Sequence, residues 1–207
     1  MKSYILMADV IRSSQKNSNI LMKNFKEIAQ QTNTQLKDAF YSPITITLGD
    51  EFQSVVRSLK DGISVIIAFE ELIIKCEKNF RLRYVLNYGE IGTPINKQRA
   101  HEMLGQGLID AREMLDIQKH KDSRFFIKDK DHEISEKLNL AFYIYQSFID
   151  SWRLKDYQTI WAFLEHEDYK VVARVLKKDV SLMWRREKTL NISEYSATKK
   201  LINLITE

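Results

Sequence analysis

Two aspartates, Asp9 and Asp50, occupy positions in this sequence where carboxylates could do chemistry. Asp9 directly follows the apolar run "YILMA", at the end of a segment that is typical of a buried strand. Asp50 lies in the tetrad "GDEF", between two segments rich in β-forming residues. Two carboxylates brought together repel each other unless a cation lies between them. Oxygen ligands suit Mg²⁺ or Mn²⁺ bound with phosphate oxygens, so the sequence predicts a metal site.

Each aspartate also has a simpler interpretation. The "GDEF" tetrad could be an ordinary tight turn that needs Gly49 for its backbone. Asp9 could cap a turn, with Arg12 and Ser13 as its partners. Strand alternation directs Glu51 to the face opposite Asp50, so Glu51 is expected to be a neighbour of the site and not a ligand.

Hydrophobic periodicity predicts the elements that position these residues. Short apolar or alternating runs indicate strands, and apolar residues at helical spacing indicate helices. The expected strands cover residues 3–10, 43–49, 51–56, 80–92 and 123–129, and the expected helices cover 17–40, 61–79 and 100–121. The resulting order, β-α-β-β-α-β-α-β, is the ferredoxin-like βαββαβ arrangement with one addition.

The composition changes along the chain. All six glycines and both prolines lie between positions 43 and 107, and the region after residue 140 reads as helices throughout. We therefore expect an α+β domain over residues 1–130 and an all-α domain over residues 131–207. The charged segment 128–139 is the expected linker.

Length, charge and cysteine content place the chain in a broad class. It has 207 residues, a net charge of +4 and one cysteine, so a disulfide framework within the chain is excluded. No window approaches the roughly 18 apolar residues of a membrane span, and the N-terminal apolar run is too short for a signal peptide. A cytoplasmic protein without membrane contact is expected.

Residues 168–190 have the outline of a helix-turn-helix. Between Lys170 and Lys188 there are seven basic and two acidic residues, a balance of +5 that suits phosphate contacts. The turn lacks the usual glycine, and Lys178 is near that position. A DNA-binding helix would begin at Ser181 or Asp179. The expected DNA contacts are Lys177, Lys178, Ser181, Arg185, Arg186 and Lys188. The alternative is a packing module with solvated charges, in which Trp152, Trp161 and Trp184 are core residues.

Four segments resemble the class III nucleotide cyclase domain in order and spacing: "YILMADVIRSS", "ITLGDEFQSVV", "LRYVLNYGEIG" and "MLGQGLIDAREML". The whole chain is similar to the SatD family, which pairs such a domain with a helix-turn-helix tail and is associated with stress and acid tolerance. The resemblance implies that Asp9 and Asp50 hold Mg²⁺ or Mn²⁺. It also implies nucleotide contacts at Arg12, Ser13, Gly49 and Arg112, and a homodimer.

The chain departs from the cyclase pattern at three positions. Ile109 replaces the asparagine of the transition state, Glu113 replaces the phosphate-binding arginine, and Ile46 replaces the base-selecting residue. Loss of one preorganised donor costs about 10²–10³ in rate, so we expect a regulator that binds a nucleotide or metal, without enzymatic activity, and that binds DNA. The alternatives are an active divergent cyclase or nucleotidyl hydrolase that uses Arg112, and a scaffold protein with neither activity.

Overall fold

The computed structural model describes residues 1–47 and 49–207. The strands are β1 (Lys2–Val10), β2 (Phe40–Ile46), β3 (Glu51–Val56), β4 (Leu82–Glu90) and β5 (Phe125–Lys128). The helices are α1 (Ser18–Gln35), α2 (Leu59–Lys75), α3 (Gln106–Gln118), α4 (His132–Ser151), α5 (Tyr157–His166), α6 (Tyr169–Leu176), α7 (Val180–Thr189) and α8 (Ile192–Ile205). Short 3-10 turns are η1 (Ser13–Gln15), η2 (Lys37–Ala39) and η3 (Leu154–Asp156). Up to β5, the strands and helices follow one another in the order expected from the sequence.

The five strands form one sheet in the order β2-β3-β1-β4-β5. β1 is central and antiparallel to both β3 and β4, and β5 runs parallel to β4 at one edge. The central position explains the nearly continuous apolar sequence of β1, because both of its faces are covered. It also places Asp9, near the end of β1, within reach of residues from two other strands.

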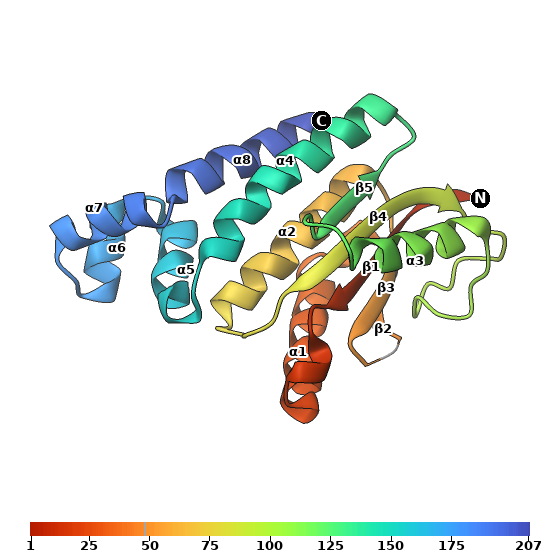
Figure 1. Cartoon of the computed structure of the whole chain (residues 1–207), viewed down its shortest axis with the longest axis horizontal. Helices are drawn as coiled ribbons and strands as arrows, with labels where there is room; N and C mark the ends of the chain where they lie inside the picture. The colour runs from red at the N-terminus through yellow and green to blue at the C-terminus, as the bar shows by residue number, and fades with distance from the viewer. Residues whose placement is uncertain (48) are drawn as a thin grey trace.

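The two faces of the sheet carry different helices (Figure 1). Leu6, Ala8 and Val10 point into a large buried cluster that α1, α2 and the C-terminal helices cover. Ile5 and Met7, on the opposite face, pack in a smaller cluster with residues of α3. This alternation follows from the two-residue period of a strand, and it assigns Asp9 to the α3 face.

Two glycines allow α3 to lie directly against β4. A Cβ atom on Gly107 would lie 2.5 Å from the carbonyl carbon of Gly89, and one on Gly89 would lie 2.5 Å from Cα of Gly107. The buried side chain of Asn87 donates a hydrogen bond to the carbonyl oxygen of Gly107, at 2.9 Å. The glycines at these positions therefore allow a close backbone approach, and Asn87 anchors the helix to β4.

The linker expected over residues 128–139 is wrong. α4 begins at His132, and the Asp131 side chain caps it by accepting hydrogen bonds from two backbone N–H groups. Leu138 and Phe142, both on α4, are fully buried in the same cluster as Phe125 of β5. The helices after residue 131 thus share a continuous core with the sheet, and Figure 1 shows α4 and α8 side by side.

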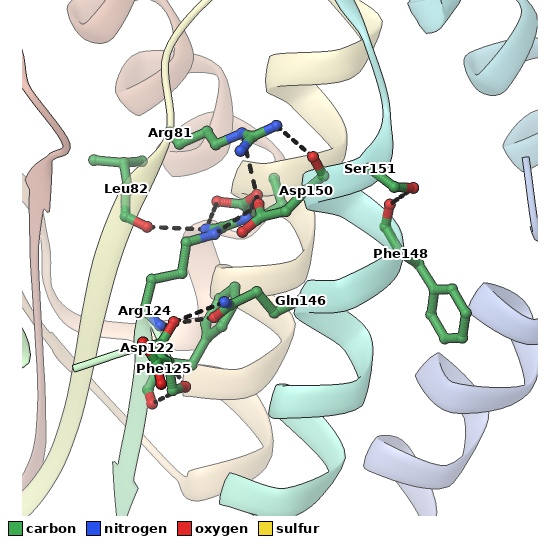
Figure 2. Close-up of polar contacts among 11 residues, drawn as sticks. Arg81, Leu82, Asp122, Arg124, Phe125, Gln146, Phe148, Asp150 and Ser151 are labelled. Atoms are coloured by element: carbon green, nitrogen blue, oxygen red, sulfur yellow. Dashed lines mark hydrogen bonds and ion pairs between the residues drawn. The ribbon is translucent and has the colours of Figure 1, made fainter.

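A buried ion pair joins this core (Figure 2). The guanidinium of Arg124 donates to both carboxylate oxygens of Glu70 on α2, at 3.0 and 2.8 Å, and to the carbonyl oxygen of Leu82 at 2.9 Å. Its Nε donates to Oδ1 of Asp150 on α4, at 3.1 Å. One arginine therefore connects the sheet, α2 and α4.

At each edge of the sheet, an asparagine from a helix binds the outward-facing backbone. Asn33 of α1 accepts from the N–H of Ile44 at 2.8 Å and donates to its carbonyl oxygen at 2.9 Å, on β2. Asn139 of α4 makes the same pair of bonds to Ile127 on β5, at 2.9 and 2.8 Å. These bonds satisfy polar backbone groups that neighbouring strands do not bind.

Candidate functional site

The tip of the β2–β3 hairpin lies against the end of β1. The N–H of Val10 donates to the carbonyl oxygen of Asp50, at 2.9 Å, which brings Asp50 next to the residue that follows Asp9. Gly49 has a φ of 82°, a conformation that favours glycine, so the turn explains this residue as expected. Leu48 lies outside the described residues. The sheet topology thus brings together the two aspartates that are 41 positions apart in the sequence.

The register of β1 and β3 changes the expected role of Glu51. Asp9 is the direct cross-strand partner of Glu51, and in an antiparallel pair such partners share a face. Strand alternation turns the Glu51 side chain to the face opposite Asp50, as expected. That face is the one on which Asp9 lies. Asp9 and Glu51 are therefore the two carboxylates that lie side by side on the α3 face.

Asp9 has a partner that the sequence interpretation missed. Arg83, its cross-strand neighbour on β4, donates to Oδ1 and Oδ2 of Asp9 at 3.2 and 3.3 Å. Burial raises the pKa of Asp9 above its usual value, Arg83 acts in the opposite direction, and the nearby charge of Asp50 adds to the rise. A buried carboxylate with a raised pKa is a common feature of functional sites.

Arg12 and Ser13, the expected turn partners of Asp9, have other surroundings in the structure. Ser13 donates a hydrogen bond to Oδ2 of Asp50, at 2.5 Å, so it belongs to the hairpin aspartate. Arg12 is exposed and adopts left-handed backbone angles, with φ 54° and ψ 41°. Ser13 and Gly49 therefore adjoin Asp50, whereas Arg12 lines a separate cavity at the start of α5.

Basic groups surround the two carboxylates of the α3 face. Arg112, from α3, donates to Oε2 of Glu51. Lys119, at the end of α3, lies close enough for its charge to act on the pKa of Asp9, and a hydrogen bond to Asp116 at 2.6 Å raises its own pKa. The arrangement alternates negative and positive charge. Arg112, expected to bind phosphate, has Glu51 as its partner.

Asp9 and Asp50 are the carboxylates expected to hold a divalent cation at the end of β1. Mg²⁺ is commonly held by one or two carboxylates together with phosphate oxygens and waters. Asp9 and Asp50 supply that number. Within residues 1–47 and 49–207, no group of three or more His, Cys, Asp or Glu residues could hold a metal. Arg83 already binds both carboxylate oxygens of Asp9, so a cation at this position would have to compete with it.

A cavity of about 380 Å³ adjoins these residues on the α3 face. Ile109, Arg112 and Glu113 of α3 line it, together with Met7 and Gln53 of the sheet. Ile109 and Glu113 are both exposed, so an apolar group and a carboxylate occupy this wall. Ile46 packs against the core on the other face of the sheet. Of the three departures from the cyclase pattern, two therefore share one cavity with Arg112.

The residues expected to contact DNA lie on α6, α7 and the turn between them. Lys177 has the left-handed turn conformation, with φ 53°, so the turn position lies next to Lys178, as expected from the sequence. Asp179 caps α7 by accepting from the N–H of Leu182, while Ser181 donates to Asp179 at 2.6 Å. These two bonds lower the pKa of Asp179.

Only some of the expected DNA contacts are free of close ionic partners in the described part of the chain. Lys177, Lys178 and Arg185 are exposed there. Arg186 donates to Oδ1 of Asp156 at 2.6 Å, and Lys188 lies 4.0 Å from Glu187. Arg186 therefore ties α7 to the start of α5.

The three tryptophans around α6 and α7 differ in their burial. Trp152 is buried and donates its indole N–H to the carbonyl oxygen of Leu190, at 2.8 Å. Trp161 is half-buried beside the core, whereas Trp184 is 49% exposed. Val180 and Leu182 are also exposed. Of the three tryptophans, Trp152 is the one that is fully in the core.

Fold and site together define a mixed α/β protein with a charged cluster at the end of the central strand of a five-stranded sheet. No described helix is both long and apolar enough to cross a membrane. Residues 4–203 match the SatD family, so this chain belongs to that family. No curated protein sequence matches the chain.

Solved structures with similar folds include three nucleotide cyclases. A bacterial light-regulated adenylyl cyclase has 10% identity and a TM-score of 0.44, covering 61% of this chain and 74% of its own. The catalytic core of a rhodopsin-guanylyl cyclase with converted specificity, in complex with ATPalphaS, has 16% identity and a TM-score of 0.36, covering 55% and 70%. The guanylyl cyclase Cya2 has 12% identity and a TM-score of 0.34, covering 56% and 70%.

Proposed function

We propose that this protein is a regulator whose sheet binds a nucleotide with Mg²⁺ or Mn²⁺ at the end of β1. The observation that carries the proposal is the backbone bond from Val10 to Asp50, which places the hairpin aspartate beside the end of β1 that carries Asp9. We also infer that the order β2-β3-β1-β4 represents the ferredoxin-like arrangement, with β5 as an addition at the edge. The metal and the phosphates would supply the charges that Asp9 and Asp50 complement.

Binding without turnover is the form of this proposal that the cavity beside α3 favours. Stabilising the charge that develops during phosphoryl transfer needs hydrogen-bond donors aimed at the phosphates. Ile109 offers an apolar side chain there, and Glu113 offers a carboxylate that repels phosphate. Arg112 is the one cation of α3 that lines this cavity among the described residues, and it already binds Glu51.

Thermal unfolding with ATP or GTP and Mn²⁺ tests the proposal. A ligand at ten times its Kd should raise the melting temperature by about 3–5 °C. Asp50→Asn should abolish this rise because it removes the charge expected to bind the metal. Asp38→Asn, at an exposed position outside the site, is the matched control and should keep the full rise. The absence of a rise with either nucleotide in the wild type would refute the proposal.

An active enzyme is the rival function, and it makes a different prediction. A divergent cyclase or nucleotidyl hydrolase that uses Arg112 would convert ATP or GTP with Mn²⁺, and Asp50→Asn would stop the reaction. Binding without product formation would support a regulator, and neither binding nor product would support a scaffold. Nucleotide binding of the cyclase type also implies a homodimer, which sedimentation of the protein with and without nucleotide would detect.

DNA binding by α6 and α7 is the second half of the proposed regulation. The supporting observation is that Lys177, Lys178 and Arg185 are exposed around one turn. Replacing these three by alanine should weaken DNA binding at all sequences. It should also reduce the salt dependence, by a slope of about 0.9 for each DNA phosphate that the variant no longer neutralises. Retained affinity in the triple variant would exclude this surface.

A control variant makes the DNA experiment specific. Lys23, Lys26 and Lys60 are exposed lysines on α1 and α2, and replacing them by alanine makes the same change in net charge. This triple variant should bind DNA like the wild type in a mobility-shift titration. Arg186→Ala is a poor probe of DNA contact, because it removes the ion pair with Asp156.

A further inference from the structure

A second cavity lies between the start of α1 and the junction of α4 with α5. Its volume is about 680 Å³, within the range of small-molecule sites. One wall is the β1–η1 turn, another is the segment leading into β4, and the third runs from the end of α4 to α5. The cavity therefore joins the sheet to the C-terminal helices.

The cavity is strongly basic. Arg12, Lys16, Arg81 and Arg153 line it, and Asp150 is the one acidic residue of its lining among the described residues. Asp150 is already engaged, because it accepts from Arg124 at 3.1 Å and lies 3.6 Å from Nε of Arg81. Like charges gathered in one place repel each other unless an ion of opposite charge neutralises them.

Two of the cations are held in place by the backbone. Arg81 donates through Nη2 to the carbonyl oxygen of Asp150, at 2.7 Å, as Figure 2 shows. Lys16 donates to the carbonyl oxygen of Asn79, at 2.8 Å. These bonds hold the charged ends of the two side chains in place. Arg81 also pairs with Asp150, whereas Lys16 has no ion pair within the described residues, so Lys16 in particular is positioned to meet an anion.

Arg12 and Arg153 supply the exposed part of the cluster. Arg12 is exposed, has no ion pair within the described part of the chain, and has a left-handed backbone that is uncommon for a residue with a side chain. Such strained positions are enriched at functional sites. Arg153 is exposed and contacts Asp156 at 3.4 Å, a contact that a stronger anion could replace.

We propose that this cavity binds a multiply charged phosphate group of a small molecule, such as a pyrophosphate or an organic diphosphate. Arginine forms paired hydrogen bonds with phosphate oxygens, and three arginines can meet more than one phosphate. Below the cations the wall is apolar, with Phe80, Trp152 and Tyr157 at most 8% exposed. The ligand would bridge the β1–η1 turn and η3.

Isothermal titration of the full chain with pyrophosphate in EDTA tests this site. Without a metal ion, the Asp9 and Asp50 site cannot contribute in the way proposed above. The wild type should bind saturably at one site. Arg12→Gln should weaken binding about ten-fold, and Arg12→Gln with Arg153→Gln about a hundred-fold, because each change removes a charge-assisted contact.

Three controls decide the result. Arg57→Gln, an exposed arginine outside the cavity, makes the same charge change and should bind like the wild type. Asp50→Asn should also bind like the wild type, which separates this site from the proposed nucleotide site. The melting temperature of the double variant without ligand should be equal to or above that of the wild type. Equal affinity in the wild type and the double variant, or an equal loss in Arg57→Gln, would overturn the proposal.

Discussion

Replacing Arg124 by leucine should lower the free energy of unfolding by about 3–5 kcal/mol, because it leaves a buried carboxylate without its partner. Arg124 and Glu70 are both about 5% exposed in their side chains. Four hydrogen bonds would be broken, to Glu70, Leu82 and Asp150. The urea unfolding midpoint of the variant and its wild-type parent measures the effect.

Two further variants identify the cause. In Arg124→Leu with Glu70→Leu, both charges of this buried pair are gone, so much of the lost stability should return. In Arg99→Leu, an exposed pair with Glu102 is broken, and a change of about 0–1 kcal/mol is expected. A double variant no more stable than Arg124→Leu would show that packing of the arginine side chain matters more than charge.

Gly107→Ala should lower the free energy of unfolding by about 3 kcal/mol, which is at the upper end for overpacking, because the added methyl group would clash with backbone atoms. The new Cβ would lie 2.5 to 2.7 Å from the backbone of Gly89 and Glu90. Backbone cannot rotate aside as a side chain can, so α3 must move off β4. Arg112 travels with α3, and its hydrogen bond to Glu51 should weaken as well.

The neighbouring Gly92 provides the control for Gly107. A Cβ on Gly92 would meet the carbonyl oxygen of Leu104 at 3.5 Å, an ordinary van der Waals distance. Gly92→Ala should therefore leave the thermal and urea unfolding midpoints unchanged. If Gly107→Ala were equally harmless, the close packing of α3 on β4 would not contribute to stability.

Local sequence patterns predicted the order of the elements and the turn at Gly49, because each depends on residues that are neighbours in the chain. The partners of Asp9 were missed because they depend on register. A shift of one residue reverses the face of every side chain on a strand. Assigning Glu51 to the Asp9 face needs the pairing of β1 with β3, which no local pattern reveals.

The role of Arg124 was missed for a related reason. An arginine in "SRFFIKD" reads as an exposed residue at the start of a strand. Its burial depends on Glu70 and Asp150, which are 54 and 26 positions away. The charged segment after β5 has the composition of a linker, although Asp131 in it caps the start of α4. Long-range partners and capping thus set the limit of the sequence analysis.

The bonds from Asn33 to Ile44 and from Asn139 to Ile127 have a consequence for self-association. An open strand edge is a template on which other chains, including misfolded copies, can add a strand. At the middle of each outer strand this protein offers an amide side chain where an incoming strand would need a free N–H and C=O. The two amides therefore oppose the addition of a further strand at Ile44 and at Ile127.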